Sequence, residues 1–193
     1  MNMSLDDPFA LAKGRLQSEF IGSTCNGILI DMHGEATSEK NAFGHYVDGK
    51  VTAVLGTHTH IPTADARILS EGTAYQTDIG MSGNYDSVIG MDKENPIHSF
   101  VKGYRSDSRF FPAQGNTTIC GTFIESDDNT GLALKIETFQ FFNFSINPGE
   151  IVLFGGKRQK NDVRAPARPR AARVRRAHRV ARVDGHAADH GRD

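Results

Sequence analysis

Two short apolar runs, each ending at a histidine-containing segment, constrain most strongly what this chain can fold into. Residues 28–32 are apolar apart from Asp31, and residues 51–55 form a second run rich in β-branched side chains. Such runs are typical of buried strands in a sheet that is covered on both faces. His33 follows the first run and His58 lies just beyond the second. Because ligands collect at the carboxyl ends of strands in α/β sheets, we expect both histidines at a functional edge.

The surrounding segments predict helices and further strands. Asp7-Pro8 is a typical helix start, since Asp caps the helix and Pro is tolerated in its first turn. The segment 35–45, which Thr37 or Ser38 could cap, favours a helix that connects the two apolar runs. Further expectations are a short strand at 75–78, a short helix at 95–102, and strands at 118–124 and 132–140 around a hairpin loop at 127–131. This order predicts an α/β (α+β) domain.

The segment His58-Thr59-His60 has the most specific chemistry in the chain. In extended backbone, residues i and i+2 face the same side, so two imidazoles there could reach one metal ion or two neighbouring ions. Neutral imidazole binds Zn, Fe and Mn. His33 supplies a third imidazole at the end of the adjacent predicted strand. On spacing alone, a metal site and a surface or packing role stay equally open.

The composition changes sharply near residue 155. Residues 155–193 contain no Leu, Ile, Met, Phe, Tyr or Cys, and such a segment buries too little apolar area to offset its ordering entropy. Residues 1–156 hold 10 Lys and Arg against 19 Asp and Glu, whereas residues 157–193 hold 12 against 4. The sequence therefore predicts one domain in residues 1–154 and a basic, Arg- and Ala-rich disordered tail in residues 155–193.

We expect no signal peptide at the N-terminus, because no basic segment there is followed by an apolar stretch. No apolar run reaches the roughly 18–20 residues that span a bilayer. Cys25 and Cys120 are the two cysteines, too few for a disulfide framework or a thiolate metal site. We expect a cytoplasmic protein with free thiols and no membrane partner.

Four longer motifs resemble one known family. They are DMHGEATSEK at 31–40, GTHTHIPTAD at 56–65, GTAYQTDIGMSG at 72–83 and YDSVIG at 85–90. Together they resemble the YmdB-like branch of the calcineurin-type metallophosphoesterases, from about Leu5 to about Thr138. The resemblance implies the C-terminal part of a metallophosphoesterase β-sandwich flanked by helices, followed here by the disordered tail.

The same resemblance implies an activity and a ligand set. Family members hydrolyse phosphodiesters, including 2′,3′-cyclic nucleotides, with two Fe, Mn or similar divalent ions, and they form homo-oligomers. Carried onto this sequence, His33 and His58 would bind one ion and His60 the other. Two such ions would clamp the phosphate and generate hydroxide from a bridging water for in-line attack.

Three carboxylates near these histidines have two interpretations each. Asp31 and Glu35 flank His33, and they would either orient an imidazole or serve as solvated or capping carboxylates. Asp78 lies in a glycine-rich segment, where it would shape a substrate pocket or only form turns. Turn formation is favoured for Asp78, because Gly, Asp and Ser are the usual turn residues.

The sequence departs from the family at both ends. The family's bridging carboxylate, amide ligand and general-acid histidine come from segments that have no counterpart here, so no catalytic residue is assigned. Histidines bring no negative charge to two mutually repelling dications, so we expect at most one weakly bound ion. We also expect an unstable or partly folded chain with weak or no activity. A truncated or frameshifted gene product would explain both ends.

Whether this chain is an enzyme by itself therefore stays open. The first hypothesis is a metal-dependent phosphodiesterase or its C-terminal part. The second is a protein that binds nucleic acid non-specifically, because eleven Lys and Arg lie between Lys157 and Arg182. No aromatic residues are interleaved there for base stacking, so no specific recognition is expected. The third is a non-catalytic remnant.

Overall fold

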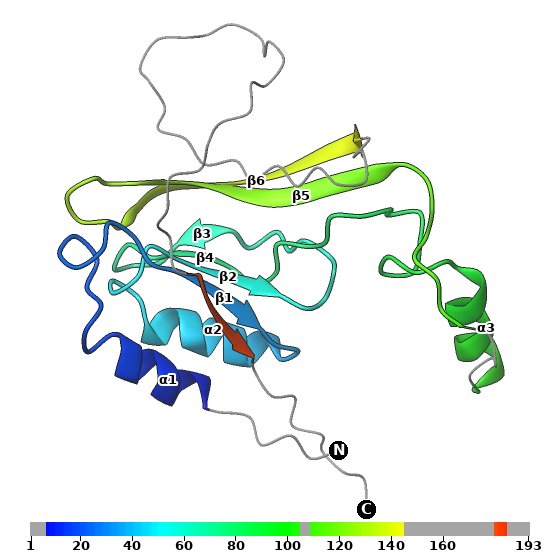
Figure 1. Cartoon of the computed structure of the whole chain (residues 1–193), viewed down its shortest axis with the longest axis horizontal. Helices are drawn as coiled ribbons and strands as arrows, with labels where there is room; N and C mark the ends of the chain where they lie inside the picture. Colours follow the sequence, from blue (N-terminus) through cyan, green and yellow to red (C-terminus); the bar gives the residue numbers. More distant parts are fainter. Residues whose placement is uncertain (1–6, 105–108, 145–179, 185–193) are drawn as a thin grey trace, which may run out of the picture.

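The computed structural model describes residues 7–104, 109–144 and 180–184, which form two sheets and three helices (Figure 1). The larger sheet has the strand order β3-β4-β2-β1-β7, and the smaller is the hairpin β5-β6. The elements are α1 (Pro8–Arg15), β1 (Leu29–His33), α2 (Thr37–Tyr46), β2 (Ala53–Thr57), β3 (Arg67–Ile68), β4 (Ala74–Gln76), α3 (Glu94–Lys102), β5 (Thr117–Ser126), β6 (Ala133–Phe144) and β7 (Val180–Asp184).

The larger sheet is covered on both faces. Helices α1 and α2 lie against one face and the hairpin lies across the other (Figure 1). On the helix side, Ile30 of β1 and Val54 of β2 pack with Phe43 of α2 in one buried cluster. On the hairpin side, Ala53 and Ala133 are buried, and their small side chains let the two sheets approach closely. The predicted α/β (α+β) class, with two packed sheets flanked by helices, is therefore confirmed.

The parallel pair β1 and β2 places the expected site at one edge of the sheet. The two strands are in register, so that Leu29 pairs with Ala53 and His33 pairs with Thr57. Both strands therefore end together, and the chain turns at this edge into the segment that contains His58 and His60. Helix α3 lies away from this edge, at one end of the molecule (Figure 1).

One short segment of the basic tail lies within the described residues. Residues 145–179 and 185–193 lie outside the described residues, but residues 180–184 form β7, which pairs in parallel with β1. The register places Asp184 opposite His33. The predicted disorder of the rest of residues 155–193 falls on residues outside those that the structure describes. A strand edge attracts any segment that can satisfy its backbone hydrogen bonds, and composition alone does not predict such pairing.

Two further observations complete the fold. The strand β3, which pairs antiparallel with β4, was missed because two residues carry no periodic pattern. Among the helices within the described residues, none is long and apolar enough to cross a membrane.

Candidate functional site

His33 is held by a relay of hydrogen bonds at the end of β1. Its Nδ1 lies 3.0 Å from the hydroxyl of Thr57, and that hydroxyl donates to Asp31 Oδ1 at 2.7 Å. Because the hydroxyl proton is directed to the carboxylate, Thr57 accepts from an Nδ1–H of His33. The Nε2 of His33 then carries a lone pair, which faces Nδ1 of His58. Asp31 thus orients His33 through the hydroxyl of Thr57.

His58 contacts two groups with its two ring nitrogens. Its Nδ1 lies 3.2 Å from Nε2 of His33, and the rings meet nearly edge to face. Its Nε2 makes a short contact with the carboxylate of Glu35, which is exposed. Glu35 accepts from an Nε2–H, and this fixes the ring of His58 with Nδ1 directed at His33. We refer to the two rings as the His33–His58 pair.

The backbone of the histidine segment is a strained turn, and the expected extended conformation was wrong. Strand β2 ends at Thr57, and the φ angles of His58 and His60 are +120° and +68°. Positive φ is uncommon for residues other than glycine, and each such position costs about 1–3 kcal/mol. The two imidazoles therefore do not share a face through strand alternation. Strain of this kind clusters at functional sites.

His60 points to a different neighbour. Its Nδ1 lies 2.8 Å from the carbonyl oxygen of Ile89, which only an Nδ1–H can satisfy. The Nε2 of His60 is then the nitrogen that remains for a ligand. Ile89 itself has a φ of +47°, so the segment that supports His60 is strained as well.

A buried ion pair lies beneath the turn. Lys40 and Asp78 are fully buried, and their Nζ and Oδ2 atoms are 3.3 Å apart. Lys40 also donates to the carbonyl oxygen of Thr57 at 2.6 Å. Asp78 accepts from the N–H groups of Thr59 at 2.8 Å and Gly80 at 2.9 Å. Asp78 is therefore a support for the turn, and its burial leaves no carboxylate exposed to a substrate.

Sequence reasoning assigned no role to Lys40, whose stem packs beside Gly56. A Cβ on Gly56 would lie 1.7 Å from the carbonyl oxygen of Thr77 and 3.2 Å from the Lys40 stem. Gly56 is therefore required for packing between β2 and the segment that follows β4. A lysine on an amphipathic helix normally faces solvent, so no sequence signal identified this one as buried.

A second support lies around Tyr85. Its hydroxyl lies 3.0 Å from Cys120 Sγ and accepts from the N–H of Met81 at 3.3 Å. It also lies 3.4 Å from the carbonyl oxygen of His60. Burial, together with the hydrogen bond to Cys120, raises the pKa of Tyr85 to about 12. Tyr85 thus stays protonated at neutral pH and connects β5 to the histidine turn.

The donor set fits part of a metal site. Each of the three histidines donates through one ring nitrogen to a protein acceptor, which is the usual way to orient a metal-binding imidazole. Two nitrogens bound to one ion at about 2.0–2.1 Å would lie about 3.0–3.4 Å apart, and the His33–His58 pair is separated by 3.2 Å. Within the described ranges, no group of three or more His, Cys, Asp or Glu is placed to hold an ion.

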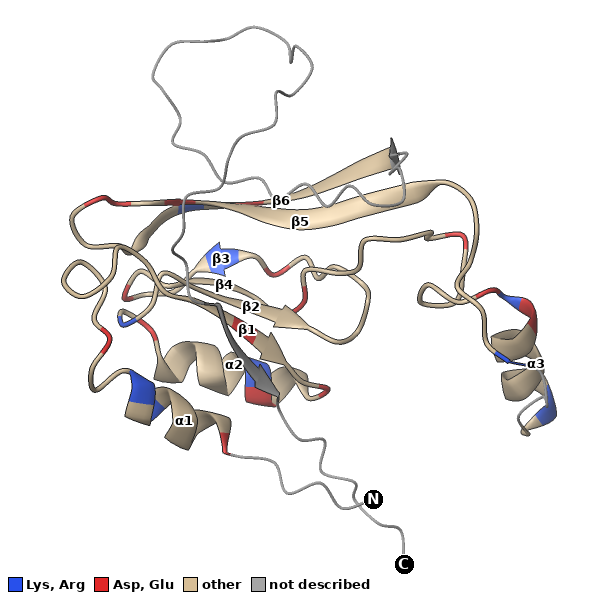
Figure 2. Ribbon diagram, in the orientation of Figure 1, with Lys and Arg blue, Asp and Glu red and all other residues tan. Residues whose placement is uncertain are grey.

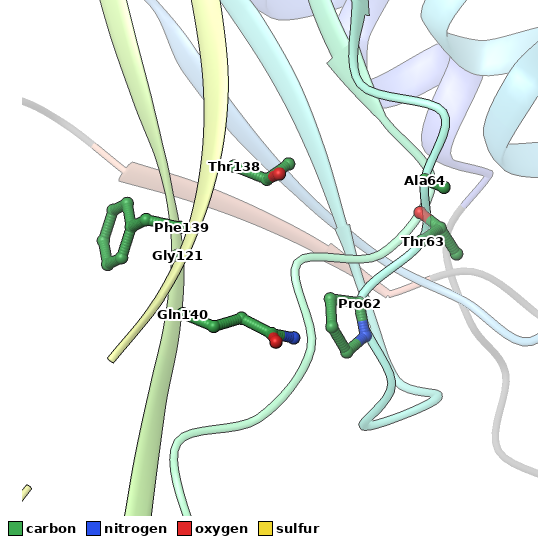
Figure 3. A pocket seen from close by; sticks show the side chains of 7 residues that line it. All are labelled: Pro62, Thr63, Ala64, Gly121, Thr138, Phe139 and Gln140. Atoms are coloured by element: carbon green, nitrogen blue, oxygen red, sulfur yellow. The ribbon is translucent and has the colours of Figure 1, made fainter. Parts of the chain in front are cut away.

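An open cavity of about 350 Å³ lies beside the segment that follows His60. It is lined by residues 62–64 on one side and by Gly121 and residues 138–140 of the hairpin on the other. In Figure 3, the side chains of Pro62 and Gln140 extend toward each other across it. Its size is in the range of small-molecule sites.

The chain is similar to known proteins over most of its described length. A family model described as "YmdB-like protein" matches residues 1–139. The chain belongs to the YmdB-like family. It is 52% identical over 133 residues to a 2′,3′-cyclic-nucleotide 2′-phosphodiesterase of Bacillus subtilis (strain 168), with 69% of this chain and 49% of that protein covered.

Two solved structures share the fold of this YmdB-like chain. A protein of Thermus thermophilus matches with a TM-score of 0.65 and 39% identity, covering 73% of this chain and 53% of the other. A phosphatase of Mycoplasma pneumoniae matches with a TM-score of 0.65 and 37% identity, covering 74% and 50%. The chain thus spans about half the length of the relatives it matches.

Proposed function

We propose that this chain carries the histidine half of a metal-dependent phosphodiesterase site, with His33 and His58 binding one ion and His60 a second. The proposed substrates are phosphodiesters of the 2′,3′-cyclic nucleotide type, and the proposed ions are Fe, Mn or similar divalent ions. The relative from Bacillus subtilis carries this phosphodiesterase name. Family membership supports the phosphoesterase class.

One observation carries the proposal. The nitrogens of the His33–His58 pair are 3.2 Å apart, and Thr57 and Glu35 hold the opposite nitrogen of each ring. Two histidines with only a packing or surface role would not need one nitrogen of each ring fixed by a protein acceptor. The strained φ angle of His58 adds a cost that a purely structural turn would avoid.

The chain's own residues have separable tasks in this proposal. A bound divalent ion would lower the pKa of a water ligand and stabilise phosphate charge. His33 and His58 would hold the ion, while Asp31 and Glu35 would keep their rings in the required tautomers. The cavity beside residues 62–64 offers room for the rest of a substrate.

The lack of negatively charged ligands limits the metal binding and turnover expected of this chain by itself. The three histidines are neutral ligands, and Asp31 and Glu35 already accept hydrogen bonds from Thr57 and His58. Two dications repel one another strongly unless carboxylates lie between them. We therefore expect one weakly bound ion and weak or no turnover by the isolated chain.

Titration calorimetry with Mn²⁺ or Zn²⁺ tests the proposal. The chain should bind one ion, and His33→Ala or His58→Ala should weaken binding at least about tenfold, which corresponds to about 1.4 kcal/mol. His45→Ala is the matched control, because His45 is exposed on α2 and should not affect binding. Any hydrolysis of bis(4-nitrophenyl) phosphate should disappear with chelator and with His58→Ala. Binding that survives both substitutions would contradict the proposal.

The basic tail supports a second candidate function. Among the described residues, Lys and Arg lie scattered over separate elements (Figure 2), whereas residues 157–193 hold 12 Lys and Arg. We propose that any binding of nucleic acid depends on this segment and weakens steeply with salt. Binding to DNA that persists after deletion of residues 157–193 would rule this out.

A further inference from the structure

We propose that Lys40 and Asp78 are positioning residues: this buried ion pair fixes the backbone on both sides of His58 and thereby aims its imidazole at His33. Only the last step, in which the aimed imidazole binds an ion, rests on the proposed function. The positioning itself is a property of the metal-free chain.

The Lys40–Asp78 ion pair contacts the peptide groups on both sides of His58. Lys40 Nζ donates to the carbonyl oxygen of Thr57, which belongs to the peptide group before His58. Asp78 Oδ2 accepts from the N–H of Thr59, which belongs to the peptide group after it. The φ and ψ angles of His58 describe rotation between these two peptide groups. Holding both groups therefore holds the φ of +120° that the residue would not adopt freely.

The Lys40–Asp78 ion pair is itself held in place by burial and by further hydrogen bonds, so that it does not move together with the histidine turn. Both side chains are fully buried, and Asp78 Oδ1 accepts from the N–H of Gly80. The backbone of Asp78 is bonded to Thr63 through its N–H at 2.9 Å and through its carbonyl oxygen at 2.9 Å. The stem of Lys40 passes beside Gly56, where a Cβ would lie 3.2 Å from it.

A buried ion pair is an inefficient way to stabilise a fold, because desolvation offsets much of the attraction and apolar pairs often do as well. Here the ion pair contributes hydrogen bonds with a defined direction. An ammonium group and a carboxylate can hold a carbonyl oxygen and an N–H two residues apart, which apolar side chains cannot do. This geometry places Nδ1 of His58 3.2 Å from Nε2 of His33.

The test uses variants that separate positioning from folding. Lys40→Met alone leaves Asp78 as an uncompensated buried charge and is expected to unfold the chain. The double variant Lys40→Met/Asp78→Asn removes both charges and should keep the fold. Thr73→Val is the matched control: Thr73 is fully buried, and its hydroxyl donates to the carbonyl oxygen of Val51 at 2.8 Å, away from the histidine turn.

The first measurement is histidine imidazole ¹⁵N NMR of the metal-free chain at fixed pH. Wild type and Thr73→Val should show His33 as a single Nδ1–H tautomer and an ordered His58. The double variant, with its fold verified by circular dichroism, should show both rings averaged like the exposed His45. Unchanged spectra of His33 and His58 in the folded double variant would overturn the proposal.

The second measurement links positioning to the proposed function. Zn²⁺ affinity should fall at least about tenfold in the double variant and stay within about twofold in Thr73→Val. If the double variant loses its ordered imidazoles but binds Zn²⁺ as wild type does, the metal-site assignment fails while the positioning role stands. If affinity falls equally in the double variant and in Thr73→Val, the pair acts through general stability and the positioning role is refuted.

Discussion

Gly56 is the residue at which β2 and the segment after β4 come closest. A Cβ there would lie 1.7 Å from the carbonyl oxygen of Thr77. Neither the Cβ nor the backbone carbonyl can move aside by rotation of a side chain. We predict that Gly56→Ala destabilises the chain by at least about 3 kcal/mol, since the overlap can be relieved only by separating the strands. Urea denaturation measures this. Gly14→Ala is the control, because nothing lies within 4 Å of its Cβ, and it should be neutral or slightly stabilising.

Tyr85 gives the chain a specific response to alkaline pH. Its pKa is raised from 10.0 to about 12, so the folded state retains the phenolic proton more strongly than the unfolded state does. The corresponding stabilisation is complete below pH 10 and is lost as pH rises to about 12. We predict that Tyr85→Phe removes this part of the alkaline destabilisation, measured by denaturation at several pH values. Tyr46→Phe, an exposed position, should retain it.

Among the elements, those with strong local patterns were predicted and those fixed by remote contacts were not. The apolar runs 28–32 and 51–55 correspond to strands β1 and β2. The hairpin β5-β6 lies where the turn residues 127–131 separate two β-rich segments. The turn at His58 was predicted as extended, because the ion pair that bends it comes from α2 and from beyond β4. Such contacts join residues 17 to 38 positions apart, and no periodicity records them.

The pairing of β1 with β7 is the least predictable feature at this scale, and it is directly testable. Strand β1 is bonded on one side to β2 and on the other to residues 180–184. We predict that truncation after Phe144 speeds amide hydrogen exchange in β1 at least about tenfold, since an unpaired edge exposes its backbone. Exchange mass spectrometry measures this, with β4 as the internal control. Unchanged exchange in β1 would show that β7 does not protect it.

The molecule as a whole combines two buried clusters with much exposed apolar surface. Phe100 on α3 is 85% exposed, and Phe142 at the end of β6 is 69% exposed. Large exposed apolar groups favour association and add nothing to the stability of the isolated chain. The two buried clusters on the faces of the larger sheet therefore carry the fold. A ligand that bridges β1 and the segment after β2 would add stability from outside these clusters.

Metal binding should therefore appear as thermal stability. An ion that binds the native His33–His58 pair and not the unfolded chain contributes about 2.7 kcal/mol at a hundredfold excess over Kd. For a chain of this length, that corresponds to an increase in Tm of roughly 5–10 °C. Circular dichroism melting with and without Mn²⁺ measures the shift, which EDTA should reverse. His45→Ala should melt as wild type does, whereas His33→Ala should show no shift. A shift retained in both His33→Ala and His58→Ala would place the ion elsewhere on the chain.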